Sequence, residues 1–258
     1  MKRVVAVVLL VAVAIGSGMV ASAEQVTVTF LGHSCFTIQA QGGDIIMIDP
    51  YATYVPYPAL PQPADVVLTT HAHIDHCPRC FGETDRYTGD PIEVFPWDSD
   101  GRTQEGTWRI TEDLVVRFIE ATHVTLSGGG QGYVTLFAFD VGGIRFAHLA
   151  DLGRTLDNDQ IAALGDVDVL FIPVGGAFTI DAAEALTVIA QLPTVKVVFP
   201  MHFYVNGITP WTDMAPLSAF TQVADVLYDV VEYETAHVVL EADALPDDVE
   251  ISILPHLE

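Results

Sequence analysis

The sequence predicts an α+β fold in which β-sheets pack together and helices cover them from outside. Strand-like segments come first along the chain, and strands then alternate with helical segments. Half of the residues are hydrophobic, which permits a substantial core and argues against disorder. Because no linker divides the chain, we expect a single domain over residues 24–258.

Residues 1–23 have the three parts of a secretory signal peptide. Lys2 and Arg3 give a positive start, residues 4–15 are almost uninterrupted apolar residues, and residues 21–23 are small. A retained membrane anchor is the alternative, but the apolar run is short for a span of about 20 residues. We therefore expect cleavage after residue 23, no stable transmembrane segment, and a secreted or periplasmic protein.

Alternating or short apolar runs predict the strands, and proline breaks up residues 51–63 too often for regular structure. The predicted strands cover residues 26–31, 35–40, 45–48, 64–69, 92–95, 114–120, 133–140, 144–148, 167–172 and 196–199.

Three segments carry helical patterns: residues 157–164, 181–191 and 216–228. The first has an acidic start and Gly165 as a stop. The second opens with Asp181 and has Glu184 three residues later, which is the spacing of a capping box.

The charge of the chain is strongly acidic. Once Lys2 and Arg3 leave with the signal segment, 34 acidic residues face 8 basic ones, so the net charge is −26 and Lys196 is the only lysine. Binding of nucleic acid relies on lysine and arginine to neutralise phosphates. We therefore expect a small-molecule substrate and no nucleic-acid partner.

Three imidazoles and one carboxylate occur within six residues, at His71, His73, Asp75 and His76. They directly follow the strand over residues 64–69, and side chains two apart in extended backbone point to the same side. His71 and His73 can therefore bind one ion, while Asp75 and His76 lie beyond a turn and can face a second. Imidazole with carboxylate suits zinc and its borderline neighbours. A histidine-rich surface loop is the alternative, although the whole chain has only nine histidines.

Three later strand ends also carry side chains able to bind a metal. His123 follows residues 114–120, Asp151 follows residues 144–148, and His202 follows the strand that ends at residue 199. Asp151 could bridge two ions through its two oxygens. The alternatives are a surface imidazole at position 123 and a helix cap at position 151.

The run from His71 to His76, followed in order by His123, Asp151 and His202, resembles the metallo-β-lactamase superfamily. Residues 31–36, 48–50 and 148–153 are similar to the branch with ascorbate-phosphate lactonase-like and phospholipase D-like hydrolases. This resemblance implies a four-layer αββα sandwich with a dinuclear site at one edge of the two sheets.

The resemblance also implies a division of the ligands between two zinc ions, with manganese or iron as alternative metals. The implied ligands are His71, His73 and His123 for the first ion, Asp75, His76 and His202 for the second, and Asp151 as the bridge. Asp75 could also orient the nucleophile or pass a proton to the leaving group, and His148 is a further candidate for the catalytic machinery.

Three other residues are candidates for contact with the substrate. His33 could approach the site, but it could equally be a hydrogen-bonded histidine at a strand end. Tyr54, in a loop of tyrosines and prolines, and Trp211, after His202, could form walls for an apolar group. For both aromatic residues, simple packing is the alternative.

The cysteines leave several states open. In an oxidising compartment Cys77 and Cys80 could form a disulfide, but both could be free thiols, or Cys77 could join the metal ligands. Cys35 alternates with apolar neighbours and is expected in the core.

These observations predict an exported dinuclear zinc hydrolase that cleaves an ester, lactone or phosphodiester bond. The alternative from another class is an exported metal-binding or sensing protein of the same fold without turnover. A β-lactam hydrolase is a further, weaker alternative.

Overall fold

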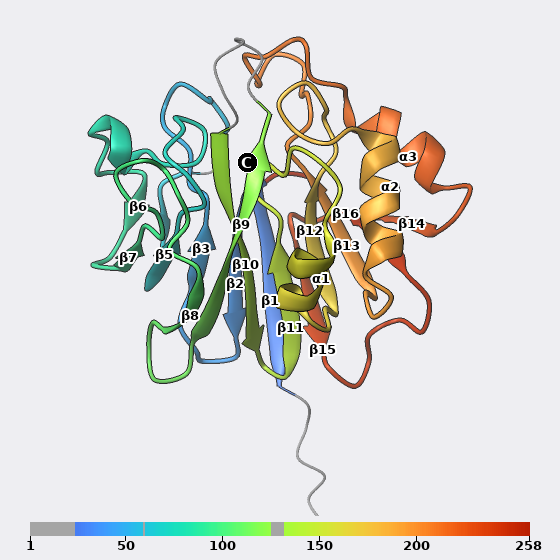
Figure 1. The fold of residues 1–258 in the computed structure, drawn as a ribbon, viewed down its shortest axis with the longest axis horizontal. Coiled ribbons are helices and arrows are strands. Elements are labelled where there is room, and N and C mark those ends of the chain that lie inside the picture. The colour runs from blue at the N-terminus through green and yellow to red at the C-terminus, as the bar shows by residue number, and fades with distance from the viewer. Residues whose placement is uncertain (1–23, 59, 125–131) are drawn as a thin grey trace, which may run out of the picture.

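The computed structural model describes residues 24–58, 60–124 and 132–258. Two β-sheets pack face to face in it, and three helices lie beside the larger sheet (Figure 1). The six-stranded sheet has the strand order β15-β1-β2-β3-β5-β7, and the eight-stranded sheet has the order β14-β16-β13-β12-β11-β10-β9-β8.

The bounds of the six-stranded sheet are β1 (Gln25–Gly32), β2 (Cys35–Ala40), β3 (Ile46–Ile48), β5 (Val66–Leu68), β7 (Ile92–Val94) and β15 (His237–Glu241). Those of the eight-stranded sheet are β8 (Gly106–Arg109), β9 (Val115–His123), β10 (Gly132–Val141), β11 (Ile144–His148), β12 (Val169–Pro173), β13 (Val197–Met201), β14 (Asp229–Glu232) and β16 (Glu250–Ile253). The remaining elements are the strand pair β4 (Gln62–Pro63) and β6 (Tyr87–Thr88), the 3₁₀-helix η1 (Arg79–Phe81), and the helices α1 (Asn158–Leu164), α2 (Ala182–Gln191) and α3 (Leu217–Ala224).

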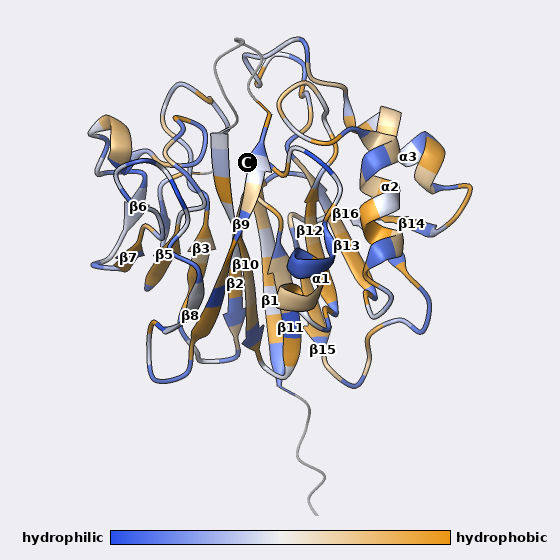
Figure 2. Ribbon diagram, in the orientation of Figure 1, coloured by the Kyte–Doolittle hydropathy of each residue, from blue (hydrophilic) through white to orange (hydrophobic). Residues whose placement is uncertain are grey.

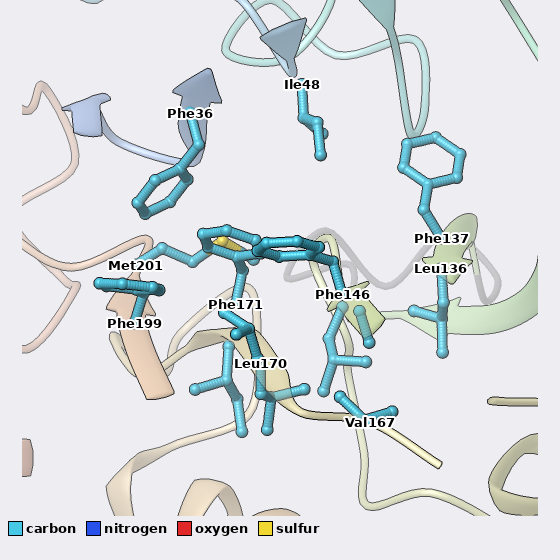
Figure 3. Close-up of a cluster of buried hydrophobic side chains, with 14 of the residues drawn as sticks. Phe36, Ile48, Leu136, Phe137, Phe146, Val167, Leu170, Phe171, Phe199 and Met201 are labelled. Atoms are coloured by element: carbon cyan, nitrogen blue, oxygen red, sulfur yellow. The ribbon is translucent and has the colours of Figure 1, made fainter. Parts of the chain in front are cut away.

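Aromatic side chains fill the space between the two sheets. Phe171 of β12 faces Phe36 of β2 with ring centroids 4.4 Å apart, and Phe199 of β13 lies 5.4 Å from Phe171 (Figure 3). All three side chains are buried. Apolar residues accordingly concentrate on the strands, whereas α2 carries alternating hydrophilic and hydrophobic bands (Figure 2). Burial of this aromatic layer drives the two sheets together.

In the described part of the chain, the proline-rich segment and not an α-helix covers the outer face of the six-stranded sheet at the inner strands β3 and β5. Met47 and Val67 alternate with strand residues that face the other sheet, and they pack against Tyr51, Val55 and Tyr57 of this segment in a second apolar cluster. The predicted α+β sandwich is confirmed, with an irregular segment as part of its outermost layer.

Most predicted elements occur where the sequence places them. The capping box predicted at Asp181 is present, and the acidic start predicted at Asp157 is a second capping box. Six strands were not predicted: β4, β6, β8, β14, β15 and β16. β4 and β6 have two residues each, and β4 lies at the end of the segment for which no regular structure was predicted. The other four are short and contain charged residues. Of these, β14, β15 and β16 depend on pairing with strands distant in the sequence, whereas β8 pairs with the next strand, β9. The third helix ends at Ala224 instead of residue 228, because Val226 and Leu227 beyond it are exposed.

The predicted signal segment lies outside the described residues. No helix in the described ranges is long and apolar enough to cross a membrane.

The strand directions bring four chain segments to one edge of the sandwich. β11, β12 and β13 are parallel, β9 runs in the same direction as β11 through the antiparallel β10, and β3 is parallel to β5. The residues that follow β5, β9, β11 and β13 therefore meet at this edge, which is where the sequence predicts the metal ligands.

The contribution of the α2 capping box to stability can be tested by removing its acceptor. The Asp181 carboxylate accepts hydrogen bonds from the amides of Ala183 (2.9 Å) and Glu184 (3.0 Å). Replacing Asp181 by alanine leaves both donors without this acceptor, so we expect a loss of about 1 kcal/mol in the free energy of unfolding. Urea denaturation of Asp181→Ala measures it. Asp243→Ala, which removes a surface aspartate outside any helix, is the control, and an equal loss in both variants would contradict the capping role.

Candidate metal centre

Two groups of ligand-type side chains meet at the strand ends. Within each group, the ligand atoms all lie within 4.8 Å of one another. One group consists of His71, His73, His123 and Asp151, and the other of His33, Asp75, His76 and His202. The division is the one that the resemblance implied, with His33 added to the second group. The grouping brings together all seven predicted ligands.

The Asp151 carboxylate lies between the two groups. Its Oδ2 is 3.2 Å from Nε2 of His123 in the first group and 3.3 Å from Nε2 of His202 in the second. Its Oδ1 is 3.2 Å from Nε2 of His76. Asp151 is almost completely buried, so its charge has few partners other than these imidazoles. A single carboxylate thus contacts both halves of the site.

Hydrogen bonds at the far side of two rings fix which nitrogen is free. The hydroxyl of Thr70 donates to Oδ2 of Asp49 (2.7 Å), so it can only accept from Nδ1–H of His71 (2.9 Å). The same Asp49 oxygen accepts from Nδ1–H of His76 (2.8 Å). In both rings the proton therefore lies on Nδ1, and the lone pair of Nε2 points toward Asp151.

In His123, a backbone carbonyl group determines which ring nitrogen carries the proton. Its Nδ1 lies 2.5 Å from the carbonyl oxygen of Val124, which can only accept a hydrogen bond, so Nε2 again carries the lone pair. His73 is more exposed, and its ring lies 4.4 Å from that of His71 and 4.8 Å from that of His123. Three rings thus converge around one position beside Asp151.

Buried polar atoms without hydrogen bonds are rare in folded proteins, yet they accumulate here. Among the described residues, the Nε2 atoms of four buried histidines of the site have no hydrogen-bond partner, and neither does Oδ1 of Asp151. The histidines concerned are His71, His76, His123 and His202. A metal ion would satisfy these converging nitrogen and oxygen atoms, so the residues fit zinc well.

The nearby carboxylates change the pKa values of the histidines at the site. Burial disfavours the charged form of His202, but Asp151 and Asp75 outweigh it and raise the pKa of His202 to about 9. His76 behaves alike: burial opposes protonation, yet Asp151, Asp75 and Asp49 raise its pKa well above the usual range. In contrast, burial and the neighbouring His76 lower the pKa of His71. Protons and metal ions compete for these nitrogens, so the site attracts cations.

His202 depends on a close backbone approach. Its φ is 52°, in the left-handed region, and its carbonyl oxygen would lie only 2.1 Å from a Cβ atom added at Gly175. His33, Asp49 and Ala150 also have positive φ values between 48° and 56°. Such strained residues cluster at functional sites because the surrounding structure must hold them.

His33, predicted as a substrate contact, lies behind Asp75. It is completely buried, and its Nε2 is 3.0 Å from Oδ2 of Asp75. Burial and the nearby His202 lower the pKa of His33 to about 4, so the ring is neutral near pH 7 and donates its Nε2–H to the carboxylate. This contact holds Asp75 in its orientation.

A cavity of about 330 Å³ opens onto the site. His73, Asp75, His123, Asp151 and His202 form its polar floor, and Ile74, Phe81, Phe178 and Trp211 form its walls. Trp211, predicted from the sequence, therefore reaches the cavity. Tyr54 contacts the edge of Trp211 (6.0 Å) but is not among the lining residues. Phe81 and Phe178 were not predicted: Phe81 follows the ligand motif by five residues but has no pattern that indicates a wall, and Phe178 is distant in the chain from any ligand.

His148 has a different position from the one that the sequence suggested. It is completely buried and does not line the cavity. Its Nε2 lies 3.1 Å from the Ser34 carbonyl oxygen, and its Nδ1 accepts from the amide of Ala150 (3.2 Å). Both ring nitrogens are thus engaged by backbone, so we assign His148 to holding the turn before Asp151 and not to the reaction.

Asp49 also supports the site, although it was not predicted as a site residue. It is completely buried and binds Thr70 and His76 together. Its signals in the sequence were its place at the end of the strand before Pro50 and its position in one of the segments that carry the resemblance, residues 48–50.

Cys77 and Cys80 form a disulfide, one of the three states that the sequence left open. It closes the turn that leads into η1, and the amide of Cys77 donates to the carbonyl of His73 (2.7 Å). The disulfide is therefore attached directly to the loop that carries the first ligands. Cys35 is a buried free thiol, as predicted for a core residue.

The model of the β-lactamase superfamily domain matches residues 27–202, a range that contains every ligand described above. The chain belongs to the metallo-β-lactamase superfamily. The match covers more than half of the chain, and the prediction of a hydrolase of this superfamily is confirmed.

Relatives and solved structures agree with this assignment. A UPF0173 metal-dependent hydrolase of Nanoarchaeum equitans is 31% identical over 193 residues, which are 68% of this chain and 83% of the relative. One of Carboxydothermus hydrogenoformans is 29% identical over 197 residues, with 68% and 84% covered. A structure from Thermotoga maritima, assigned as a Zn-dependent hydrolase of this superfamily, superposes with a TM-score of 0.64 at 26% identity and covers 89% of this chain and 98% of that one.

The support that Asp49 gives to His71 and His76 can be tested by removing its charge. In Asp49→Asn the amide cannot accept all three hydrogen bonds, so we expect metal affinity to fall about 10- to 100-fold. Competition with a chromophoric chelator measures it. Asp44→Asn, on the exposed loop before β3, is the control, and unchanged affinity in Asp49→Asn would contradict the supporting role.

Proposed function

We propose that the protein is an exported hydrolase that uses two zinc ions to cleave an ester, lactone or phosphodiester bond. The observation that carries this proposal is the buried Asp151 carboxylate between two groups of free Nε2 atoms. His71, His73 and His123 would hold one ion, Asp75, His76 and His202 the other, and Asp151 both. This set contains the nitrogen and oxygen ligands that zinc prefers.

Bound zinc would lower the pKa of a water molecule and polarise the oxygen of the bond under attack. The protein's own contribution is to orient the reacting groups at the floor of the cavity. His33 and Asp49 keep Asp75 and His76 in place through hydrogen bonds of 3.0 and 2.8 Å. Both partners are completely buried, which makes these orientations rigid.

Asp75 is the group best placed to move a proton. Its Oδ2 faces His33, His76 and His202, so Oδ1 is the oxygen available to exchange a proton. Asp75 also lines the cavity. During hydrolysis the attacking water loses a proton and the leaving oxygen gains one, and a carboxylate at the floor of the cavity can serve both steps.

Export is supported by two independent features. Residues 1–23 have the composition of a signal peptide, and a disulfide between Cys77 and Cys80 persists best in an oxidising compartment. The strongly acidic composition also disfavours a nuclease, because a polyanionic substrate would be repelled.

Metal content and turnover test the central chemistry together. Zinc-loaded protein should contain about two ions per chain, and Asp75→Asn should lower the rate of ester or lactone hydrolysis about 100-fold or more, because it removes both the proton carrier and a carboxylate ligand of the second ion. Plasma emission spectrometry and a spectrophotometric assay provide the measurements.

Asp213→Asn, an exposed aspartate on the loop after Trp211, is the matched control and should keep full activity. His73→Ala should lose both zinc and activity. Tight binding of zinc with every ester, lactone and phosphodiester left intact would instead indicate a metal-binding protein without turnover.

Export has its own test. When the full chain is expressed in a bacterial host with a secretion system, mass spectrometry of the exported protein should show an N-terminus at Glu24, because signal peptidase cleaves after small residues. A chain that keeps Met1 and sediments with the membranes would indicate a retained anchor instead.

A further inference from the structure

The walls of the cavity over the metal centre are almost entirely apolar. The polar lining residues are the proposed metal ligands, and the others are Ile74, Phe81, Phe178 and Trp211. Once the ligands hold metal, little is left in the lining to hydrogen-bond with a substrate. The part of the substrate that extends away from the metals therefore meets hydrocarbon and aromatic surface.

Cationic side chains are absent from this cavity. Among the residues that the structure describes, no lysine or arginine lines it. Arg79, next to the lining residue Phe81 in η1, pairs with Glu93 (3.2 Å), and Arg154 lines a separate cavity beside α1. Proteins bind phosphate and carboxylate groups with arginine or lysine in most cases. An anionic group remote from the metals would lose its hydration here without gaining a partner.

The net negative charge of the whole protein also disfavours anionic substrates. The chain carries 34 acidic and 10 basic residues, a net charge of −24 before any cleavage. Such a field lowers the local concentration of anions around the cavity mouth. Anionic substrates are therefore disfavoured both during approach and after binding.

The aromatic wall is held in place from several directions. Trp211 stacks on the buried His33 (centroids 5.5 Å apart, 29° between planes) and meets Phe178 edge-on at 6.3 Å. Phe81, on η1 after the turn closed by the Cys77–Cys80 disulfide, also lines the cavity. Because Trp211 stacks on a buried ring and contacts Phe178, an apolar group can bind against these two rings at little entropic cost.

The size of the cavity limits the apolar group. Its volume of about 330 Å³ lies at the small end of the range of ligand sites, which is about 300–1,000 Å³. A compact aromatic or short alkyl group fits this space, whereas a lipid with two long chains does not.

We propose that the substrate is a compact, uncharged carboxylic ester or lactone with an apolar group beside the scissile bond. This inference rests on the proposed hydrolase function and narrows it: a phosphorylated lactone carries a charge remote from the metals that the cavity does not accommodate, and the acidic protein disfavours the approach of an anionic phosphodiester. In the reaction the water oxygen bonds to the acyl carbon, the C–O bond to the alcohol breaks, and the alcohol oxygen takes up a proton.

Two acetate esters separate charge from size. 4-Methylbenzyl acetate and 4-carboxybenzyl acetate differ only at a position remote from the ester, where one has a methyl group and the other a carboxylate. For the zinc-loaded protein we expect kcat/KM to be about tenfold or more higher for the methyl compound, since the carboxylate finds no cation in the cavity. Equal rates, or faster cleavage of the carboxylate compound, would overturn the inference while leaving the hydrolase function intact.

A cationic side chain added to the cavity wall should reduce the preference for 4-methylbenzyl acetate over 4-carboxybenzyl acetate. Phe81 has an exposed fraction of 52%, so Phe81→Arg adds a cation at the cavity without disturbing the core, and we expect the preference to fall at least about threefold. Leu227→Arg is the matched control: Leu227 is 62% exposed, lies after α3 and does not line the cavity. An equal fall in both variants would show a general charge effect and contradict the role of the wall.

Binding provides a readout that does not need turnover. Trp211 lines the cavity, so the neutral ester should change tryptophan fluorescence at lower concentration than the carboxylate, and Trp211→Phe should lose this change. If neither ester is cleaved but the neutral one binds more tightly, the inference about the cavity stands and the hydrolase function fails. If the carboxylate binds equally well, the inference fails.

Discussion

The buried carboxylate of Asp151 is the interaction on which the rest of the site depends. It is almost completely buried and lies 3.2 to 3.6 Å from the Nε2 atoms of four imidazoles, those of His71, His76, His123 and His202. A buried charge is costly unless it is paired. The fold supplies the partners from the ends of β5, β9 and β13, which is why strands distant in the sequence must end at one edge. The hydrogen bonds of Asp49, Thr70 and Val124 then orient the rings.

Local patterns predicted a large part of this arrangement. The helix start at Asp157, the capping box at Asp181, the strand β2, and the clustered ligands from His71 to His76 depend on residues close together in the sequence, so their signals are local. The later ligands could be placed because each follows a predicted strand. Strands β14, β15 and β16 could not, since distant pairing stabilises them and their own alternation is weak. β8 pairs with the neighbouring strand β9, but its four residues contain one large apolar side chain, that of Trp108, and show no clear alternation. The role of His148 could not be predicted from local sequence either. Its position at a strand end suggested a catalytic role, but backbone groups of Ser34 and Ala150 occupy both of its ring nitrogens.

The metal centre and the cavity above it have opposite characters, and together they narrow the chemistry. Polarity is concentrated at the floor, where His73, Asp75 and Asp151 lie, while Phe81, Phe178 and Trp211 make the walls apolar. This contrast suits a reaction in which charge develops only at the bond under attack, next to the metals. Of the aromatic wall residues, Trp211 was predicted from the sequence, whereas Phe81 and Phe178 were not, because they reach the cavity from a disulfide-closed turn and from a loop between β12 and α2. Membership of the superfamily accounts for the floor, and this chain's own loops account for the walls.

The central claim is that Asp151 joins two metal positions, and diffraction from zinc-loaded crystals at the zinc absorption edge tests it most directly. We predict two anomalous peaks, each about 2 Å from an oxygen of Asp151, with one also bound by His71 and the other by His76. A single peak, or two peaks of which one has no contact with Asp151, would contradict the account.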